Sequence, residues 1–397
     1  MENVPLLELE VISYKLSTSE TRLEDITGEN FNPSFDCALP TSENMTSVII
    51  KKNFLMRRYR CAIFGSLKLK TMRAVFIMIL VLFLASCSDD GCRTSSITSQ
   101  VVSMKIERLE SALFNANSKA EILSILESNK SFSDLFLSAN EYPDSEVLAN
   151  KIFQLTKDEF IDTLYAEVIT EFEDISVFES DMNDALGRLK TLFPEMRTPR
   201  MQTVVTGLYN DLYISDSLII VGLDYFIGPQ ATFPPVNIPQ YILRRYDKNH
   251  LPTTLIKFLS GPYISKGKNE TLISEMIDFG KSFYLLSQLM PCTQDSILMG
   301  YSQKELKTAQ KNHAVIWANL VENKILYETN HITKRKFLGE RPNIYEISEE
   351  CPGRIGAWIG WQIVRSYMSN NNVDIKDLIK DRDNDRIFRL SGYKPKG

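Results

Sequence analysis

The sequence is poor in the side chain that most often binds catalytic zinc. It contains only three histidines in 397 residues, His250, His313 and His331. None of them has a second histidine three to five residues away, so the HExxH pattern of zinc peptidases is absent. C-terminal to residue 86, the chain also lacks a G-x-S-x-G nucleophile elbow, a P-loop and a G-x-G-x-x-G loop. These absences exclude the common signatures of zinc peptidases, serine hydrolases and nucleotide-binding proteins.

The charge composition shows no excess of basic residues. Forty-five Lys and Arg oppose 50 Asp and Glu, which gives a net charge of −5. Both signs are mixed along the chain, so the sequence carries no nucleic-acid footprint, and we expect no nucleic-acid partner.

A single long apolar run is present, and it is typical of a targeting signal. Met72 and Arg73 precede the run AVFIMILVLFLA at 74–85, which is followed by Ser86 and Cys87. A spanning helix needs about 20 apolar residues, so this run predicts a secretory signal peptide over 72–86. The small residues before Cys87 fit a lipobox, which predicts lipid attachment to that cysteine and a membrane partner. An ordinary signal peptide that ends near a cysteine is the alternative.

These boundaries divide the chain into four parts. Residues 1–71 are interpreted as an extension from a start codon placed too early, with Met72 or Met56 as the true start. Residues 87–102 are polar and small, and predict a flexible tether behind the lipidated cysteine. Residues 103–397 remain for the globular domain, which is long enough to bury a sizeable core.

Residue patterns in 103–397 predict an α+β fold, a mostly helical single domain with a small β-sheet. Helical periodicity and capping boxes at Ser118 and Ser302 mark several helices. Two apolar runs, 203–208 and 217–224, predict paired strands, most simply a hairpin. Three glycines on one face of the helix expected over 353–369 indicate that another backbone approaches closely there. The expected segments are a strand at 104–109 and helices at 118–130, 145–172, 181–193, 272–290, from 302 onward, and at 375–380.

The cysteines of the domain leave two interpretations open. In an oxidising envelope compartment, Cys292 and Cys351 are candidates for a disulfide, with Cys92 left over. Two buried free thiols fit the spacing equally well.

One short region is dense in aromatic and charged side chains. Asp224 and Tyr225 follow the second predicted strand, and Tyr241, Arg244 and Arg245 come soon after. They could line a binding cleft. They could equally form a loop packed on the core, with Arg244 paired to Asp224.

Several segments together carry a family resemblance. They are GLDYFIG (222–228), IPQYILRRY (238–246), MIDFGKSFYLLSQLMP (276–291) and PGRIGAWIGWQIVRSYM (352–368). In their order and spacing, the chain from about residue 104 to 397 resembles the GldB-type gliding motility lipoproteins. The resemblance implies an envelope lipoprotein required for gliding, linked to the machinery that moves and exports surface adhesins. It transfers no catalytic residue.

A more remote similarity links such domains to predicted zinc peptidases. The helix that would carry HExxH reads MIDFGKSF here, so Asp278 and Ser282 stand where the two histidines belong, and Phe279 replaces the glutamate. The scaffold would then be a degenerate zincin-like metallopeptidase without its metal, and Asp278 and Ser282 would belong to the old cleft.

These patterns together lead to one expected function. We expect a membrane-anchored, non-enzymatic component or assembly factor of the motility and adhesin-export machinery, without cofactor, whose partners are other envelope proteins. The alternative is a peptidase-like envelope hydrolase with a divergent site.

Overall fold

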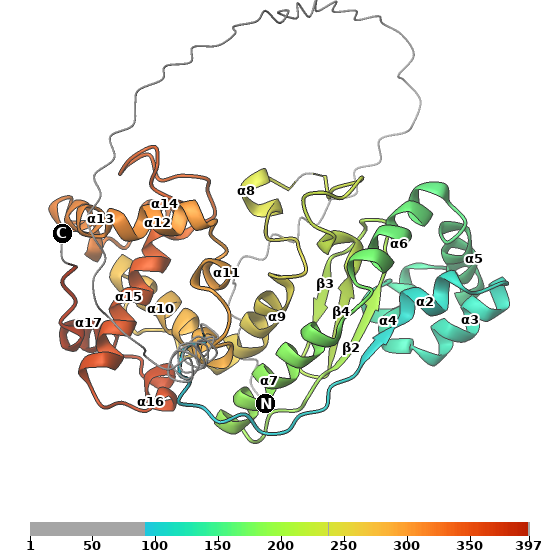
Figure 1. Cartoon of the computed structure of the whole chain (residues 1–397), viewed down its shortest axis with the longest axis horizontal. Coiled ribbons are helices and arrows are strands. Elements are labelled where there is room, and N and C mark those ends of the chain that lie inside the picture. Colours follow the sequence, from blue (N-terminus) through green and yellow to red (C-terminus); the bar gives the residue numbers. More distant parts are fainter. Residues whose placement is uncertain (1–91, 237, 396–397) are drawn as a thin grey trace, which may run out of the picture. The chain divides into compact units, whose positions relative to one another are not determined.

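The computed structural model describes residues 92–236 and 238–395 (Figure 1). The predicted extension, the predicted signal peptide and Cys87, the predicted site of lipid attachment, lie outside the described residues. Within them, the protein is mostly helical and carries one four-stranded sheet, which confirms the expected α+β class. No described helix is both long enough and apolar enough to cross a membrane.

The sheet is mixed, with strand order β1-β2-β4-β3. Strands β1 (Ile106–Arg108), β2 (Arg200–Val204) and β4 (Leu218–Gly222) run parallel, and β3 (Leu212–Ile214) is antiparallel to β4 at the edge. The predicted hairpin between 203–208 and 217–224 is therefore wrong. All five residues of β4 are buried, as is typical of a central parallel strand, and the true hairpin joins β3 to β4.

Side chains on the two faces of the sheet pack into two separate hydrophobic cores. Leu218 and Ile220 of β4 belong to a smaller core, formed with the helices between residues 109 and 155, which precede β2 in the chain. Ile219 and Val221, which alternate with them, belong to the larger core that continues into the C-terminal helices. Alternation along a strand sends successive side chains to opposite faces, so β4 joins both layers.

The expected helices form, with two breaks, one of which lies at Asn312, where the segment expected from 302 onward divides into two helices. The segment expected as one helix over 145–172 is two, separated at Thr156–Asp158, because the Asp158 carboxylate caps a new helix by accepting from the Phe160 and Ile161 amides. The helices of the N-terminal half are α2 (Leu109–Phe114), α3 (Lys119–Ser128), α4 (Lys130–Leu135), α5 (Ser145–Leu155), α6 (Glu159–Glu171) and α7 (Ser176–Leu192).

The C-terminal half is built around α10 (Leu272–Leu289) and α15 (Ile355–Asn370), which pack closely together. A Cβ placed on Gly360 would lie 1.6 Å from the Met276 backbone oxygen, and one on Gly280 would lie 2.3 Å from the Gly360 oxygen. This contact confirms the close backbone approach expected from the glycines of α15. The other helices here are α8 (Gln240–Leu243), α9 (Leu251–Ser260), α11 (Asp295–Met299), α12 (Gln303–Lys311), α13 (His313–Glu322), α14 (His331–Leu338), α16 (Ile375–Lys380) and α17 (Asn384–Ser391).

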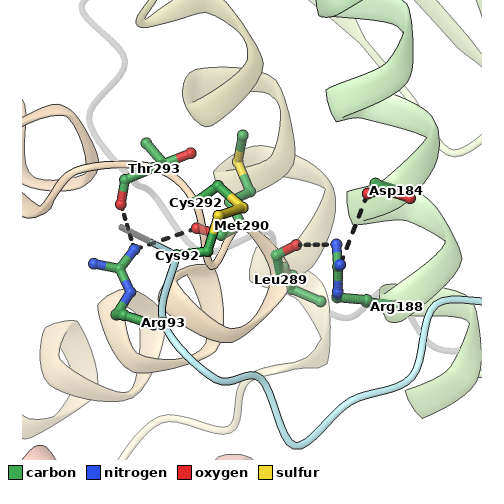
Figure 2. The surroundings of a disulfide bond; sticks show 8 residues. All are labelled: Cys92, Arg93, Asp184, Arg188, Leu289, Met290, Cys292 and Thr293. Atoms are coloured by element: carbon green, nitrogen blue, oxygen red, sulfur yellow. Dashed lines mark hydrogen bonds and ion pairs between the residues drawn. A yellow bond between two sulfur atoms is a disulfide. The ribbon is translucent and has the colours of Figure 1, made fainter. Parts of the chain in front are cut away.

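A disulfide joins Cys92 to Cys292, 200 residues apart in sequence, just beyond the end of α10 (Figure 2). The predicted Cys292–Cys351 pair is therefore wrong. Cys351 is a buried free thiol, and its Sγ lies near the Pro352 carbonyl. Spacing alone could not identify the partner, because the small and polar residues around Cys92 predict a tether rather than a part of the folded domain.

Residues 92–102, which we expected to belong to a flexible tether, are held against the domain. Next to the disulfide, the Arg93 amide donates to the Pro291 carbonyl at 2.9 Å, and its guanidinium donates to the carbonyls of Met290 and Thr293 (Figure 2). Further along, the Gln100 amide donates to the Gly187 carbonyl of α7. We call residues 92–102 the strap.

The α10–α15 contact predicts a large effect for a small substitution. Gly360→Ala should lower the free energy of unfolding by about 1–3 kcal/mol, because its Cβ meets main-chain atoms that cannot move aside without separating the helices. Gly356→Ala on the same helix is the matched control, since its Cβ would meet a Leu338 methyl group at 3.0 Å and the Phe337 carbonyl oxygen at 3.1 Å, contacts that a small shift relieves. Urea unfolding checks the difference, and equal stability of the two variants would contradict the proposed contact.

The disulfide predicts a defined pattern of thiol chemistry. Peptide mapping without reduction should recover the peptides of Cys92 and Cys292 linked together, while Cys351 reacts with iodoacetamide only after denaturation, because it is buried. Replacing both Cys92 and Cys292 by Ser should cost about 2–5 kcal/mol of unfolding free energy. A linked peptide that contains Cys351 would refute this assignment.

Candidate functional site

The residues of the predicted cleft fall into three separate places. Asp224, in the 3-10 turn after β4, is fully buried. Its carboxylate accepts hydrogen bonds from the amides of Thr206 and Leu208, at 3.0 and 2.6 Å, and from the Thr206 hydroxyl. Tyr225 donates its hydroxyl to the Leu208 carbonyl. The expected alternative pairing of Asp224 with Arg244 is wrong, and Asp224 instead fixes the turn after β2.

This turn contains two consecutive residues in the left-handed region, Gly207 and Leu208. The Asp224 carboxylate satisfies the amides on either side of Gly207. Burial raises the pKa of Asp224, against the hydrogen bonds that favour its charged form. Asp224 and Tyr225 therefore hold a strained connection.

Asp278 occupies the second place, on α10. It accepts from the Gly267 amide at 3.0 Å, from the Asn384 amide side chain at 2.8 Å and from Lys281 at 3.1 Å. Ser282 lies one turn further along α10 and is half-buried. Asp278 therefore ties α10 to the preceding loop and to α17.

The described part of the chain contains no group of three His, Cys, Asp or Glu side chains that could hold a metal ion. His313, on α13, contacts the rings of Trp358 and Tyr393, and its pKa is lowered by burial. His250 lies beside Asp247 at the start of α9. His313 and His250 therefore share no contact residue.

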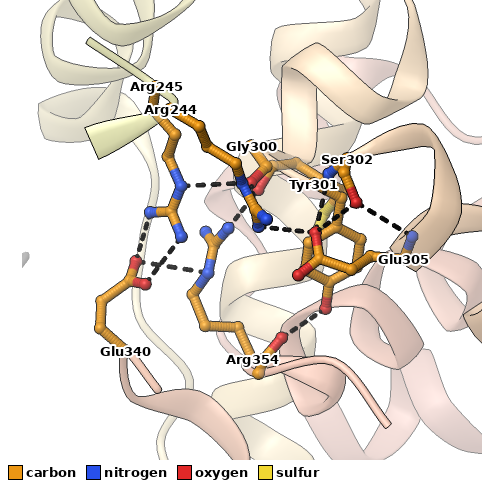
Figure 3. A network of polar contacts seen from close by, with 10 residues as sticks. Arg244, Arg245, Gly300, Tyr301, Ser302, Glu305, Glu340 and Arg354 are labelled. Atoms are coloured by element: carbon orange, nitrogen blue, oxygen red, sulfur yellow. Dashed lines mark hydrogen bonds and ion pairs between the residues drawn. The ribbon is translucent and has the colours of Figure 1, made fainter. Parts of the chain in front are cut away.

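The third place is a polar cluster around Arg244 and Arg245, which follow α8 (Figure 3). The Arg245 guanidinium forms a two-point ion pair with the Glu340 carboxylate, at 2.8 and 2.9 Å. Arg354 contacts the same carboxylate at 3.3 Å. Arg244 pairs with Glu305 at 2.6 Å. Figure 3 shows the three guanidinium groups converging beside Gly300. Tyr241 is half-buried on α8, just before this pair of arginines.

Local backbone chemistry positions these groups. Gly300 ends α11 with a φ of +65°, and a Cβ there would lie 2.8 Å from Arg245 Cδ, so only glycine suits this position. Its carbonyl accepts from Arg245 at 3.1 Å. Ser302 and Glu305 form the expected capping box of α12, and the same Glu305 carboxylate receives Arg244.

The pKa values of Glu340, Arg354 and Lys257 are shifted well away from their ordinary values. Burial opposes the charge of Glu340, but hydrogen bonds from Arg245 and the charges of Arg354 and Arg245 lower its pKa from 4.5 to about 2. Burial and the neighbouring Arg245 lower the pKa of Arg354 to about 10. Lys257, on α9, has its pKa lowered to about 8, first by burial and then by the charge of Arg354. These shifts mark one group of mutually interacting charges.

A cavity of about 270 Å³ lies at the carboxyl end of β2. Parallel strands often place ligand sites at this edge. Its lining is mainly apolar, and Lys151 donates there to the Tyr142 hydroxyl at 3.2 Å. The cavity has room for an apolar group, whereas the arginine cluster presents charged guanidinium and carboxylate groups.

The sequence identified Arg244 and Arg245 but missed four of their neighbours. Glu305 could have been found, because its capping box was recognised from the sequence. Lys257, Glu340 and Arg354 come from three distant segments with no shared motif, and only folding brings them together.

The shifted pKa of Glu340 predicts a dependence of stability on pH. A carboxyl whose pKa is lowered on folding stabilises the protein above its unfolded pKa of 4.5, and this contribution is lost as the pH falls to about 2. Glu340→Gln should remove up to roughly 3 kcal/mol near neutral pH and flatten the acid-dependent loss. Urea unfolding across this range tests it, with the exposed Glu349→Gln as control. A wild-type pH profile in the Glu340 variant would contradict the prediction.

Comparison with known proteins gives one match. The family described as gliding motility protein GldB matches residues 92–395, which is the part of the chain that contains the strap, the sheet and the arginine cluster. No curated protein and no solved structure matches the chain significantly. Because the family match covers far more than half of the 397 residues, the protein belongs to the GldB family of gliding motility proteins.

Proposed function

We propose that this protein is a lipid-anchored component of the gliding machinery that acts by docking to other envelope proteins rather than by catalysis. The family match over residues 92–395 carries the proposal. Family membership relates the chain to gliding motility. The lipobox before Cys87 and the short name of the family, which marks a lipoprotein, support the anchor.

The disulfide supports an envelope location. Disulfides form and persist mainly in oxidising compartments, and the domain carries one between Cys92 and Cys292. Cytosolic enzymes keep such thiols reduced. This chemistry agrees with export directed by the signal predicted at 72–86.

The position of the disulfide also limits how far the domain can lie from an anchor. Cys92 follows Cys87 by five residues, and an extended chain spans at most about 3.5 Å per residue. A lipid on Cys87 would therefore hold Cys292, and with it the end of α10, within roughly 21 Å of the attachment point, because the disulfide adds a Cα–Cα distance of 4.0 Å to the five-residue span. A domain held so close to a bilayer is suited to contacts with neighbouring membrane-bound proteins.

The hydrogen bonding of the acidic candidates favours docking over hydrolysis. A general acid or base must reach a substrate proton. The Asp224 carboxylate is buried and accepts from Thr206 and Leu208, and that of Asp278 is engaged by Gly267, Lys281 and Asn384. Both therefore have structural roles that account for their placement.

Removing the lipidated thiol tests this function. A Cys87→Ala chain should be produced, should fail to incorporate labelled fatty acid and should leave the membrane fraction. Cells that carry it should lose gliding, because several acyl chains are needed for stable anchoring and none would remain. Membrane fractionation and scoring of movement on a surface measure both effects.

Ser88→Ala is the matched control, since it changes the adjacent residue and leaves the thiol in place. It should label, fractionate and glide as the wild type does. Normal gliding by cells that express only the soluble Cys87→Ala chain would refute the anchoring role. Stoichiometric zinc in the purified domain would favour a hydrolase instead.

A further inference from the structure

Helix α12 presents a row of three exposed lysines to solvent. Lys304, Lys307 and Lys311 follow one another at spacings of three and four residues, so they lie on one face of the helix. Leu306 and Ala309 are buried on the opposite side. The lysine row is therefore a solvent-facing line of positive charge about 10 Å long.

The described part of the chain does not neutralise the lysine row. None of the three ammonium groups forms an ion pair or a hydrogen bond there. Glu350 lines the same hollow of about 440 Å³ as the lysines but is not paired with them, and Glu305 of α12 is paired with Arg244. The hollow thus carries two excess positive charges on a chain whose net charge is −5. Like charges at these spacings repel one another, so the row lowers helix stability without compensation inside the domain.

The lysine row starts next to the disulfide-bonded end of α10. The Gln303 side-chain amide, at the start of α12, donates to the Gln294 side-chain oxygen at 2.6 Å and to the Ser296 hydroxyl at 2.8 Å. Gln294 follows Cys292 by two residues, and Cys292 is bonded to Cys92 (Figure 2). These contacts place the row beside the point where the strap is covalently joined to the domain.

The anchor proposed at Cys87 would bring a bilayer within reach of the row. Cys92 follows Cys87 by five residues, so the joined end of the domain lies no farther than roughly 21 Å from the lipid attachment point. An anionic bilayer attracts basic side chains over about one Debye length, which is about 8 Å at physiological ionic strength. Because the anchor already holds the domain close to the surface, a weak attraction is enough to orient it.

We propose that the lysine row of α12 is a docking surface for the anionic headgroups of the bilayer to which the protein is anchored. The inference rests on the proposed lipid anchor, and it adds which face of the domain lies against the membrane. Lysine suits this partner because its ammonium is a compact charge on a flexible stem, which can follow headgroups that move within the bilayer. Each basic residue near an anionic surface strengthens binding roughly 5-fold, so the three lysines together contribute on the order of 100-fold.

The composition of the hollow favours a lipid surface over an acidic protein. The centre of a protein–protein interface is typically apolar and rich in aromatic side chains. The residues that line this hollow are Gln, Lys, Thr, Asn and Glu, without an apolar centre. A polar, basic surface beside a lipid anchor matches a layer of charged headgroups, and an acidic protein is the alternative that the experiment must exclude.

Chemical modification of the lysines tests the proposal. The lipoprotein is purified in detergent from cells that express the full chain, and is reconstituted into phosphatidylcholine vesicles, alone or with an equimolar amount of phosphatidylglycerol. A membrane-impermeant acetylating reagent then labels exposed amines, and mass spectrometry gives the rate at each lysine. Phosphatidylglycerol should slow the acetylation of Lys304, Lys307 and Lys311 roughly 5-fold, because headgroups cover the amines. High salt should remove this slowing, since it screens the attraction.

Exposed lysines elsewhere in the same molecules give an internal control. Lys119 on α3 and Lys130 on α4 should be acetylated at equal rates in both kinds of vesicle. Lys307→Glu places an acid in the middle of the row, so phosphatidylglycerol should no longer slow the acetylation of Lys304. This variant should fold, because a glutamate three or four residues from a lysine stabilises a helix. Lys119→Glu is the matched control and should leave the slowing at Lys304 intact.

Flotation of the vesicles separates this proposal from the anchoring role. If the protein floats with both kinds of vesicle and phosphatidylglycerol leaves the acetylation of the row unchanged, the docking surface is overturned while the anchor stands. A purified chain that carries no lipid and does not float overturns both. Slowing in membranes isolated from cells, but not in vesicles, assigns the row to an acidic protein and overturns the lipid surface. Slowing that Lys307→Glu fails to reduce does so too.

Discussion

Helices α10 and α15 approach so closely that main-chain atoms of one helix contact glycines of the other, at Met276, Gly280 and Gly360. This contact fixes the positions of two other features, the disulfide and the arginine cluster. The C-terminal end of α10 leads to Cys292 and the disulfide, while α15 begins immediately after Arg354 in the arginine cluster. Close packing of this kind resists deformation, so both features occupy defined positions in one framework.

The framework also explains how a charged cluster persists in a partly buried place. Arg244, Arg245 and Glu340 come from loops, yet Gly300 and Arg354 belong to the rigid ends of α11 and α15. Buried charges are stable only when their partners are held in good geometry. The helices α12 and α15 supply Glu305 and Arg354 in that geometry, and the loops supply Arg244, Arg245 and Glu340.

The sequence predicted the fold class well, because helical periodicity and capping boxes are local signals. The glycines of α15 correctly indicated a close backbone contact. The strand pairing could not be predicted, since β2 begins at Arg200, ahead of the apolar run expected at 203–208, and only the insertion of β3 makes β2 and β4 parallel. Cys92–Cys292 and the assembly of Lys257 with Arg354 are long-range events, and no local pattern encodes them.

The disulfide has a mechanical consequence. Any tension applied to the chain ahead of Cys92 passes through covalent bonds to Cys292, 200 residues further along the polypeptide. The load therefore enters the molecule at the end of its most tightly packed helix pair. Without this bond, the same pull would peel the strap away and then act on β1, an edge strand of only three residues. The sheet and the helices that cover it are thus shielded from the force, and they keep their shape while the C-terminal half bears the stress.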